Sequence, residues 1–313
     1  MSRSSTSGRP PKRPKNARSN PRVKRNGGDA AQGSKGKRPH PRNGSTTSKP
    51  RSAQPRQASE KRSAPDRLFL YGQHTVRAAL SNPDRRKFRL ILTDNALARL
   101  GYDSNAHAVK ALSQTWNNPA IEVRSAGDIA GLVSADAVHQ GIALECAPLD
   151  TLDASELFNL VDAKTVLALD QITDPHNVGA ILRTAVAMNV DAVLITHRNS
   201  ANETAVLAKS ASGALDFARV VDIRNMSKAL AELNAMGFMS IGLDSEGPLV
   251  LEDTLQAVQG RPVVLVLGAE GKGLREKTRE TCTHLARLDM PGAIKSLNVS
   301  NAAALALYLV SHR

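Results

Sequence analysis

Near the C-terminus, polar side chains gather where a loop leads into an apolar helix. Ser296, Asn298 and Ser300 lie within five residues of one another and follow a loop that contains Pro291 and Gly292. A helix start needs only one such side chain, whose oxygen accepts a hydrogen bond from an unpaired backbone N–H. The surplus of hydrogen-bonding groups predicts a ligand site at this junction. A well-capped core helix is the open alternative.

A glycine-rich turn directly after an aliphatic strand is the second candidate. Residues 263–267 are all aliphatic and are followed by Gly268, Glu270, Gly271 and Gly273. Glycine lets the backbone approach a ligand closely. The spacing matches neither the dinucleotide fingerprint nor a nucleoside-triphosphate phosphate loop, which disfavours both cofactor classes. Glu270 is a candidate for contact with a substrate hydroxyl or a neighbouring side chain, and an exposed turn carboxylate is the alternative.

The third candidate lies where a buried strand at 165–170 leads into a helix expected over 178–190. Asn177 precedes that helix and is predicted to cap it. Arg183 lies inside the helix among apolar neighbours, where a long cation is either a surface residue or a reader of an anion. Each junction taken alone has a structural explanation, so the functional interpretation depends on all three together.

Alternating strands and helices must position these junctions. Within residues 164–313, apolar strand patterns recur at 165–170, 192–195, 218–221, 239–243 and 263–267. Such alternation is typical of an α/β fold with a doubly wound parallel sheet. Ligands bind such sheets beyond the carboxyl ends of the strands. We therefore expect the three junctions to converge on one pocket.

A second, smaller α/β domain is predicted before this sheet. Residues 67–148 contain strand patterns that alternate with helix patterns, and helix–strand alternation of this kind indicates a separate α/β unit. A polar linker is expected over 149–163. The boundaries therefore predict a tail at 1–66 and a main domain at 164–313.

The strongly basic character of the chain belongs to its N-terminal segment. Residues 1–66 hold 18 Lys and Arg against 3 Asp and Glu, whereas the whole chain holds 42 against 29. The segment also contains 9 of the 16 prolines and no aromatic residue, a composition that predicts disorder. A cationic tail suits RNA phosphates. A solubility segment or a transit peptide is the alternative.

Cysteine and histidine usage bears on the compartment and on metal binding. Cys146 and Cys282 are too few for a disulfide framework, which fits a reducing interior. The sequence has no apolar run of membrane-spanning length, so we expect a soluble protein and no membrane partner. His74, His139 and His176 have no ligand partners at metal spacing, so no metal is expected. The bacterial cytoplasm is the expected location, with an organellar matrix open.

Taken together, the order and content of the three junctions resemble the SpoU/TrmH family of RNA ribose 2′-O-methyltransferases, within the SPOUT superfamily. The nearest branch methylates guanosine in 23S ribosomal RNA. The first family motif resembles residues 174–180 with Arg183. The second resembles residues 267–273, and the third resembles 290–292 followed by 296–300.

The resemblance implies a fold, a cofactor and an assembly. It implies a SPOUT-type parallel sheet with a C-terminal trefoil knot in residues 164–313, preceded by a small α/β RNA-binding domain at 67–148. S-adenosyl-L-methionine would bind in the knotted loops, lined by Gly268, Leu288 and Leu297. Family members act as homodimers, with the active site near the subunit interface.

The resemblance also implies the residues of the reaction, which are Asn177, Arg183, Glu270, Ser296 and Asn298. A free guanidinium is a poor base. We therefore expect Arg183 to hold the phosphate next to the reacting ribose and to stabilise the nascent alkoxide. The other four would fix Arg183, the ribose and the loops.

Large-subunit ribosomal RNA is the expected substrate, because simple transfer-RNA members of the family lack an N-terminal domain. Two alternatives stay open. One is a transfer-RNA ribose methyltransferase on the same scaffold. The other is a non-catalytic RNA-binding ribosome-assembly factor, which S-adenosylmethionine binding would distinguish from an enzyme.

Overall fold

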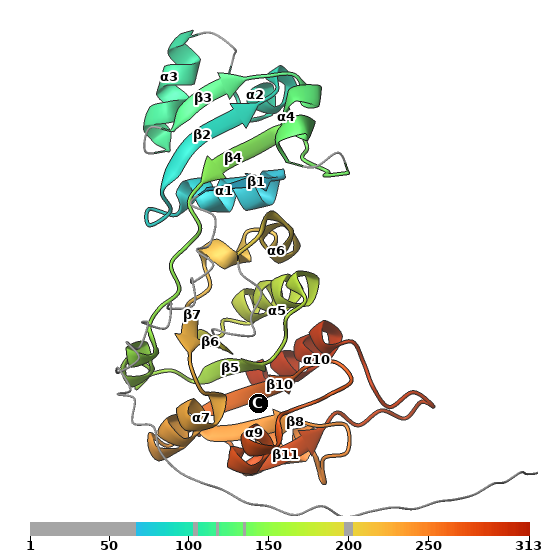
Figure 1. Cartoon of the computed structure of the whole chain (residues 1–313). Coiled ribbons are helices and arrows are strands. Elements are labelled where there is room, and N and C mark those ends of the chain that lie inside the picture. Colours follow the sequence, from blue (N-terminus) through green and yellow to red (C-terminus); the bar gives the residue numbers. More distant parts are fainter. Residues whose placement is uncertain (1–66, 103–105, 117–118, 134–135, 197–202) are drawn as a thin grey trace, which may run out of the picture. The chain divides into compact units, whose positions relative to one another are not determined.

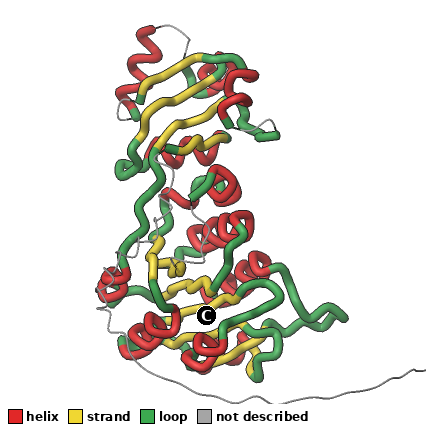
Figure 2. The backbone as a smooth tube through the Cα atoms, in the orientation of Figure 1, coloured by secondary structure: helices red, strands yellow, loops and turns green. Residues whose placement is uncertain are grey.

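A computed structural model describes residues 67–102, 106–116, 119–133, 136–196 and 203–313. The basic segment 1–66 that was predicted to be disordered lies outside the described residues. The described residues form a four-stranded and a seven-stranded sheet (Figures 1 and 2). The residues of both sheets fall within one unit, so the domain boundaries at 148 and 164 stay a prediction. Within this described part, no helix is long and apolar enough to cross a membrane.

The seven-stranded sheet is parallel throughout. In spatial order its strands are β7 (Val220–Ile223), β6 (Ala192–Thr196), β5 (Thr165–Asp170), β10 (Val263–Gly268), β8 (Met239–Leu243), β11 (His284–Arg287) and β9 (Leu249–Val250). Every neighbouring pair is parallel, which confirms the parallel sheet. The short strands β9 and β11 were not predicted.

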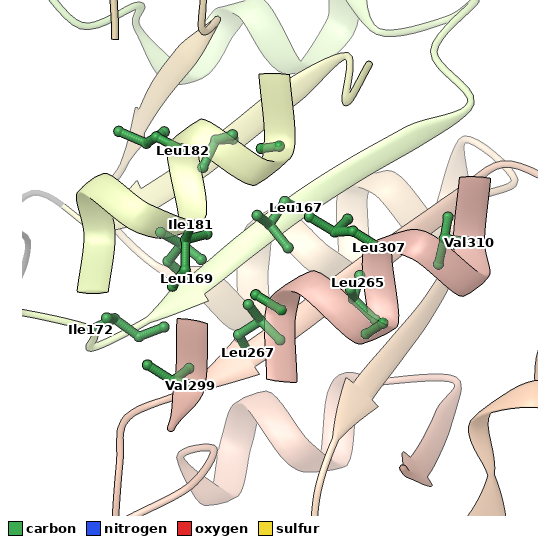
Figure 3. Close-up of a cluster of buried hydrophobic side chains, with 14 of the residues drawn as sticks. Leu167, Leu169, Ile172, Ile181, Leu182, Leu265, Leu267, Val299, Leu307 and Val310 are labelled. Atoms are coloured by element: carbon green, nitrogen blue, oxygen red, sulfur yellow. The ribbon is translucent and has the colours of Figure 1, made fainter. Parts of the chain in front are cut away.

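Helices cover both faces of this sheet. They are α5 (Pro175–Ala187), α6 (Ala205–Ala211), α7 (Met226–Ala235), α8 (Leu251–Ala257), α9 (Glu276–Thr281) and α10 (Val299–Ser311), with 3₁₀ turns η1 (Ala154–Asn159) and η2 (Ala214–Asp216). Because successive strand residues point to opposite faces, the aliphatic strands β5 and β10 supply two separate cores. Leu167 and Leu265 pack with α5, α8 and α10, as Figure 3 shows for α5 and α10. Val166 and Val264 pack with η1 and α7 on the other face.

Helix α5 begins earlier than the sequence indicated. It starts at Pro175, and its cap is Asp174, whose carboxylate accepts the His176 N–H at 3.2 Å. Proline suits the first helical position because the missing N–H would have no partner there. The prediction that Asn177 caps the helix is therefore wrong. Asn177 lies inside the first turn, and its side chain contacts another segment instead.

The four-stranded sheet is mixed. Its spatial order is β1 (Leu68–Tyr71), β4 (Ile142–Cys146), β2 (Lys87–Leu92) and β3 (Ala120–Val123), and its helices are α1 (Gln73–Ser81), α2 (Asp94–Arg99), α3 (Ala106–Thr115) and α4 (Ala126–Leu132). Strand β4 is antiparallel to β1 and β2, and β3 is parallel to β2. The predicted alternation of strands and helices is present. The RNA-binding role of these residues stays a prediction.

Candidate active site

Three segments that are far apart in the sequence meet at the carboxylate of Glu270. This residue lies in the turn after β10, and its Oε1 accepts hydrogen bonds from Asn177 Nδ2 at 3.1 Å and from Asn298 Nδ2 at 2.5 Å. The backbone N–H of Val299 donates to the same oxygen at 3.1 Å. Asn298 Nδ2 also donates to Asn177 Oδ1 at 3.0 Å. The three junctions therefore meet at one polar cluster, although residues 174–187 contribute nothing to the cavity wall described below, so their convergence on one pocket stays a prediction.

The side chain of Asn298 has two functions in this cluster. Its Oδ1 accepts the Ser300 N–H at 2.9 Å and the Ser300 hydroxyl at 2.5 Å, so it caps α10. Its amide nitrogen donates to Glu270 and Asn177, as described above. Capping and cluster formation are therefore not alternatives at this junction, because one amide provides both.

The turn that carries Glu270 is folded tightly against the end of its strand. Gly273 N donates to Ala269 O at 2.8 Å. A Cβ on Gly268 would lie 2.2 Å from the carbonyl carbon of Gly273, so only glycine fits there. Gly271 and Gly273 have φ values of 76° and 65°, a region that glycine adopts without strain. The turn therefore presents bare backbone at the carboxyl end of β10.

A cavity of about 650 Å³ opens beside this turn. Residues that follow β8, β10 and β11, together with the start of α10, form its wall, as expected for a ligand site of a parallel sheet. Six of the residues predicted for catalysis or cofactor binding line it, namely Gly268, Glu270, Leu288, Ser296, Leu297 and Asn298.

Several wall residues were missed at the level of sequence. Asp244 and Ser245 follow β8, and Arg287 and Met290 lie at and beyond the end of β11. Arg287 was missed because β11 is a short strand without an aliphatic run. A polar Asp-Ser pair directly after the expected strand at 239–243 was the available signal, but its place beside β10 depends on strand order.

The structure does not bring Arg183 to this cavity. Its side chain is exposed on α5, and within the described residues it is neither among the wall residues nor hydrogen-bonded. Helical residues rotate by about 100° each, so positions 177 and 183 point about 120° apart on the helix. Asn177 reaches the cluster only through Glu270 and Asn298.

The groups at the site favour positioning rather than covalent chemistry. No cysteine lines the cavity among the described residues, and burial followed by the charge of Asp170 raises the pKa of the Cys282 thiol to about 12, which leaves it protonated at neutral pH. Among the described residues, no three His, Cys, Asp or Glu side chains are grouped to hold a metal ion. What the cluster offers is a fixed carboxylate, two amides and exposed turn backbone.

Proteins with a parallel sheet that carries a polar cluster and a cavity at its carboxyl edge form a known class. The profile of the SpoU rRNA Methylase family matches residues 164–308. A curated relative that is 35% identical is matched over 94% of its length. The chain belongs to the SpoU rRNA methylase family.

The similar proteins are themselves well defined. The 35% identical relative is the 23S rRNA (guanosine-2′-O-)-methyltransferase RlmB of Pseudomonas aeruginosa, and the match covers 76% of this chain. RlmB of Vibrio vulnificus is 34% identical over 77% of this chain and 94% of that protein. The SpoU methyltransferase AviRb of Streptomyces viridochromogenes, solved with AdoMet, has a similar fold. Its TM-score is 0.61 at 18% identity, over 79% of this chain and 90% of that one.

Proposed function

We propose that this chain transfers a methyl group from S-adenosylmethionine to a ribose 2′-hydroxyl of 23S-type ribosomal RNA. The observation that carries the proposal is the Glu270, Asn177 and Asn298 cluster, which borders a cavity at the carboxyl edge of the sheet. Family membership supports it, as do the names of relatives that are 34–35% identical.

The residues at the cavity fit S-adenosylmethionine. Small-molecule sites usually enclose about 300–1,000 Å³, and this cavity of about 650 Å³ lies in that range. Gly268 lets the turn fold closely onto the strand end. Gly271 and Gly273 line the cavity with open space where a Cβ would stand, while Leu288 and Leu297 provide apolar wall. The bound cofactor supplies an electrophilic methyl group. The protein's part is to orient the hydroxyl that attacks it.

Glu270 is the residue we assign to the ribose. Three donors hold its Oε1, so the carboxylate has one orientation. Within the described residues Oε2 has no hydrogen-bond partner, and it is available to accept a hydrogen bond from the substrate hydroxyl. Alignment of reacting atoms is a large contributor to rates of this kind. We assign Ser296 and Asn298, which both line the cavity, to holding the neighbouring loop and the ribose.

Arg183 is assigned to the phosphate beside the reacting ribose and to the nascent alkoxide. Its exposure on α5, without an ion pair in the described residues, leaves its charge available to RNA. Arg183 does not line the cavity of its own protomer. In a homodimer with the site near the subunit interface, it would act at the cavity of the partner. Exposed Leu305 and Tyr308 on α10 support an apolar contact of this kind.

The other parts of the chain are assigned from the resemblance to the SpoU/TrmH family. The chain leaves β11, passes through the loop at 288–298 and returns to α10, which packs against α5 and β10. We assign a C-terminal trefoil knot to residues 164–313, and the return of the chain to α5 and β10 is compatible with it. We assign residues 67–148 to RNA binding, 149–163 to a linker, 1–66 to an RNA-binding tail and the protein to the bacterial cytoplasm.

The test is methyl transfer from labelled S-adenosylmethionine to 23S ribosomal RNA, compared with Arg183→Ala. We expect the variant to lose at least about 100-fold in rate, because removing a group that stabilises developing charge costs about that much. Calorimetry should show unchanged S-adenosylmethionine affinity, since Arg183 lies outside the cavity wall.

Each outcome of these assays distinguishes the proposed function from an alternative. Transfer to transfer RNA instead of ribosomal RNA would identify the alternative substrate. Cofactor binding without transfer to either RNA, or no cofactor binding, would contradict the proposed function. Unchanged turnover of Arg183→Ala would remove that residue from the reaction.

A further inference from the structure

A second polar connection lies at the base of the turn that carries Glu270. Asp170, the last residue of β5, is completely buried. Its Oδ1 accepts from Arg275 Nε at 2.7 Å and forms an ion pair with the Arg275 terminal nitrogen at 2.6 Å. Its Oδ2 accepts the backbone N–H of Arg275 at 3.1 Å.

This ion pair closes the turn onto the sheet. Asp170 pairs in register with Gly268, where the turn leaves β10. Arg275 is the residue at which the turn ends, directly before α9. The turn is therefore held to the end of β5 at both of its ends, by strand pairing at Gly268 and by the ion pair at Arg275.

The same pair connects two of the three junctions. Asp170 opens the segment that leads to α5 and Asn177, and Arg275 closes the segment that contains Glu270. A buried ion pair often adds little net stability compared with apolar residues of similar volume. Its directed, charge-assisted hydrogen bonds instead define geometry. The hydrogen bonds of the pair therefore fix the position of Glu270 relative to Asn177.

We propose that Asp170 and Arg275 are positioning residues that act through Glu270 in methyl transfer. The proposal rests on the proposed function for the reaction that it serves. The pair sets the height of the turn above the sheet, so that the Glu270 carboxylate reaches both amides and the backbone N–H of Val299. Loss of the contact between the two guanidinium nitrogens and Oδ1 would let the turn move without removing any group of the site.

The test is a double-mutant cycle with Arg275→Lys and Glu270→Ala. Lysine keeps the charge beside Asp170 but cannot place two nitrogens on Oδ1 as the planar guanidinium does. Because a small misplacement of a reacting group is costly, we expect Arg275→Lys to slow single-turnover transfer about 10- to 100-fold. In the Glu270→Ala background the further loss should be less than about threefold, since the positioned group is gone.

A second measurement needs no turnover. The Val299 N–H donates to Glu270, so its hydrogen exchange reports whether Glu270 is in place. We expect faster exchange of this amide in Arg275→Lys, with the melting temperature near that of the wild type. Unchanged exchange would overturn the proposal, as would equal losses of rate in both backgrounds.

The matched control is Arg219→Lys. Arg219 is paired with Glu156 at 2.7 Å, and its side chain is 35% exposed, against 40% for Arg275. It should change neither the transfer rate nor the Val299 exchange. A control variant with the same effect as Arg275→Lys would also overturn the proposal. If the wild-type protein transfers no methyl group, the proposed function fails, while the exchange measurement still decides whether the pair positions Glu270.

Discussion

At the scale of single residues, the site depends on side chains that serve two partners at once. Asn298 shows this most clearly, because its oxygen caps α10 while its nitrogen holds Glu270 and Asn177. Asparagine is one of the few side chains with an acceptor and two donors on the same group. Serine provides a cap of similar strength but lacks the amide. The two functions can therefore be separated by substitution.

We expect Asn298→Ser to keep the cap and lose the contact with Glu270. Its free energy of unfolding should lie within about 0.5 kcal/mol of the wild type, because serine and asparagine are similar caps. Methyl transfer should fall about 10- to 100-fold through loss of alignment. Asn298→Ala should lose transfer and also about 1 kcal/mol of stability.

Urea denaturation and transfer assays on the same preparations provide the check for these two variants. Full activity in Asn298→Ser would mean that the residue only caps the helix. Equal stability of the serine and alanine variants would remove the capping contribution.

At the scale of elements, the position of Asn177 depends on how closely α5 packs against α6. Gly179 is buried at this contact, and a Cβ there would lie 2.7 Å from Leu207 O and 2.9 Å from Ala211 N. Both atoms belong to the backbone of α6, so they cannot move aside unless the helix itself shifts. His176 Nδ1 adds a contact with Ser210 Oγ at 3.2 Å. The first turn of α5 is thereby held in place beneath the site.

Gly179→Ala should destabilise the protein by about 1–3 kcal/mol, the usual cost of overpacking. The direction is opposite to helix propensity, which favours alanine over glycine. The matched control is Gly131→Ala in α4, where a Cβ would meet no atom within 4 Å. That variant should gain up to about 1 kcal/mol. Chemical denaturation of both variants is the measurement, and stabilisation by Gly179→Ala would contradict close packing of α5 and α6.

At the scale of the whole molecule, charge and fold are separated along the chain. Residues 1–66 carry 18 Lys and Arg against 3 acidic residues, so the other 247 residues carry 24 against 26. The part that holds the cavity is therefore close to neutral, and we expect the N-terminal segment to supply most of the long-range attraction to RNA phosphates.

Deletion of residues 1–66 should weaken RNA binding and flatten its dependence on salt. Each phosphate contact contributes about 0.7–0.9 to the slope of log K against log salt, so lost contacts appear directly in that slope. Fluorescence anisotropy at several salt concentrations measures it. S-adenosylmethionine affinity should not change, because no residue of the cavity wall is removed. An unaltered slope would assign the segment another purpose.

Much of the fold and of the site could be predicted from local patterns. The aliphatic strand at 263–267, the glycine turn after it and the polar start of α10 are features of neighbouring residues, and each is present as expected. The parallel sheet follows from their alternation. Asn177, Glu270 and Asn298 were also identified, although the cap of α5 was assigned to Asn177 rather than Asp174.

What the sequence by itself determined is which side chains are available at each strand end. Only the tertiary structure decided which strand ends are neighbours. Strand order places β8 and β11 beside β10, and it brings Asp170 to Arg275 across 105 positions of the chain. The physical reason is that the spacing of apolar residues along a helix or strand shows which face of that element is buried. Contacts between distant segments depend instead on the path of the chain between them.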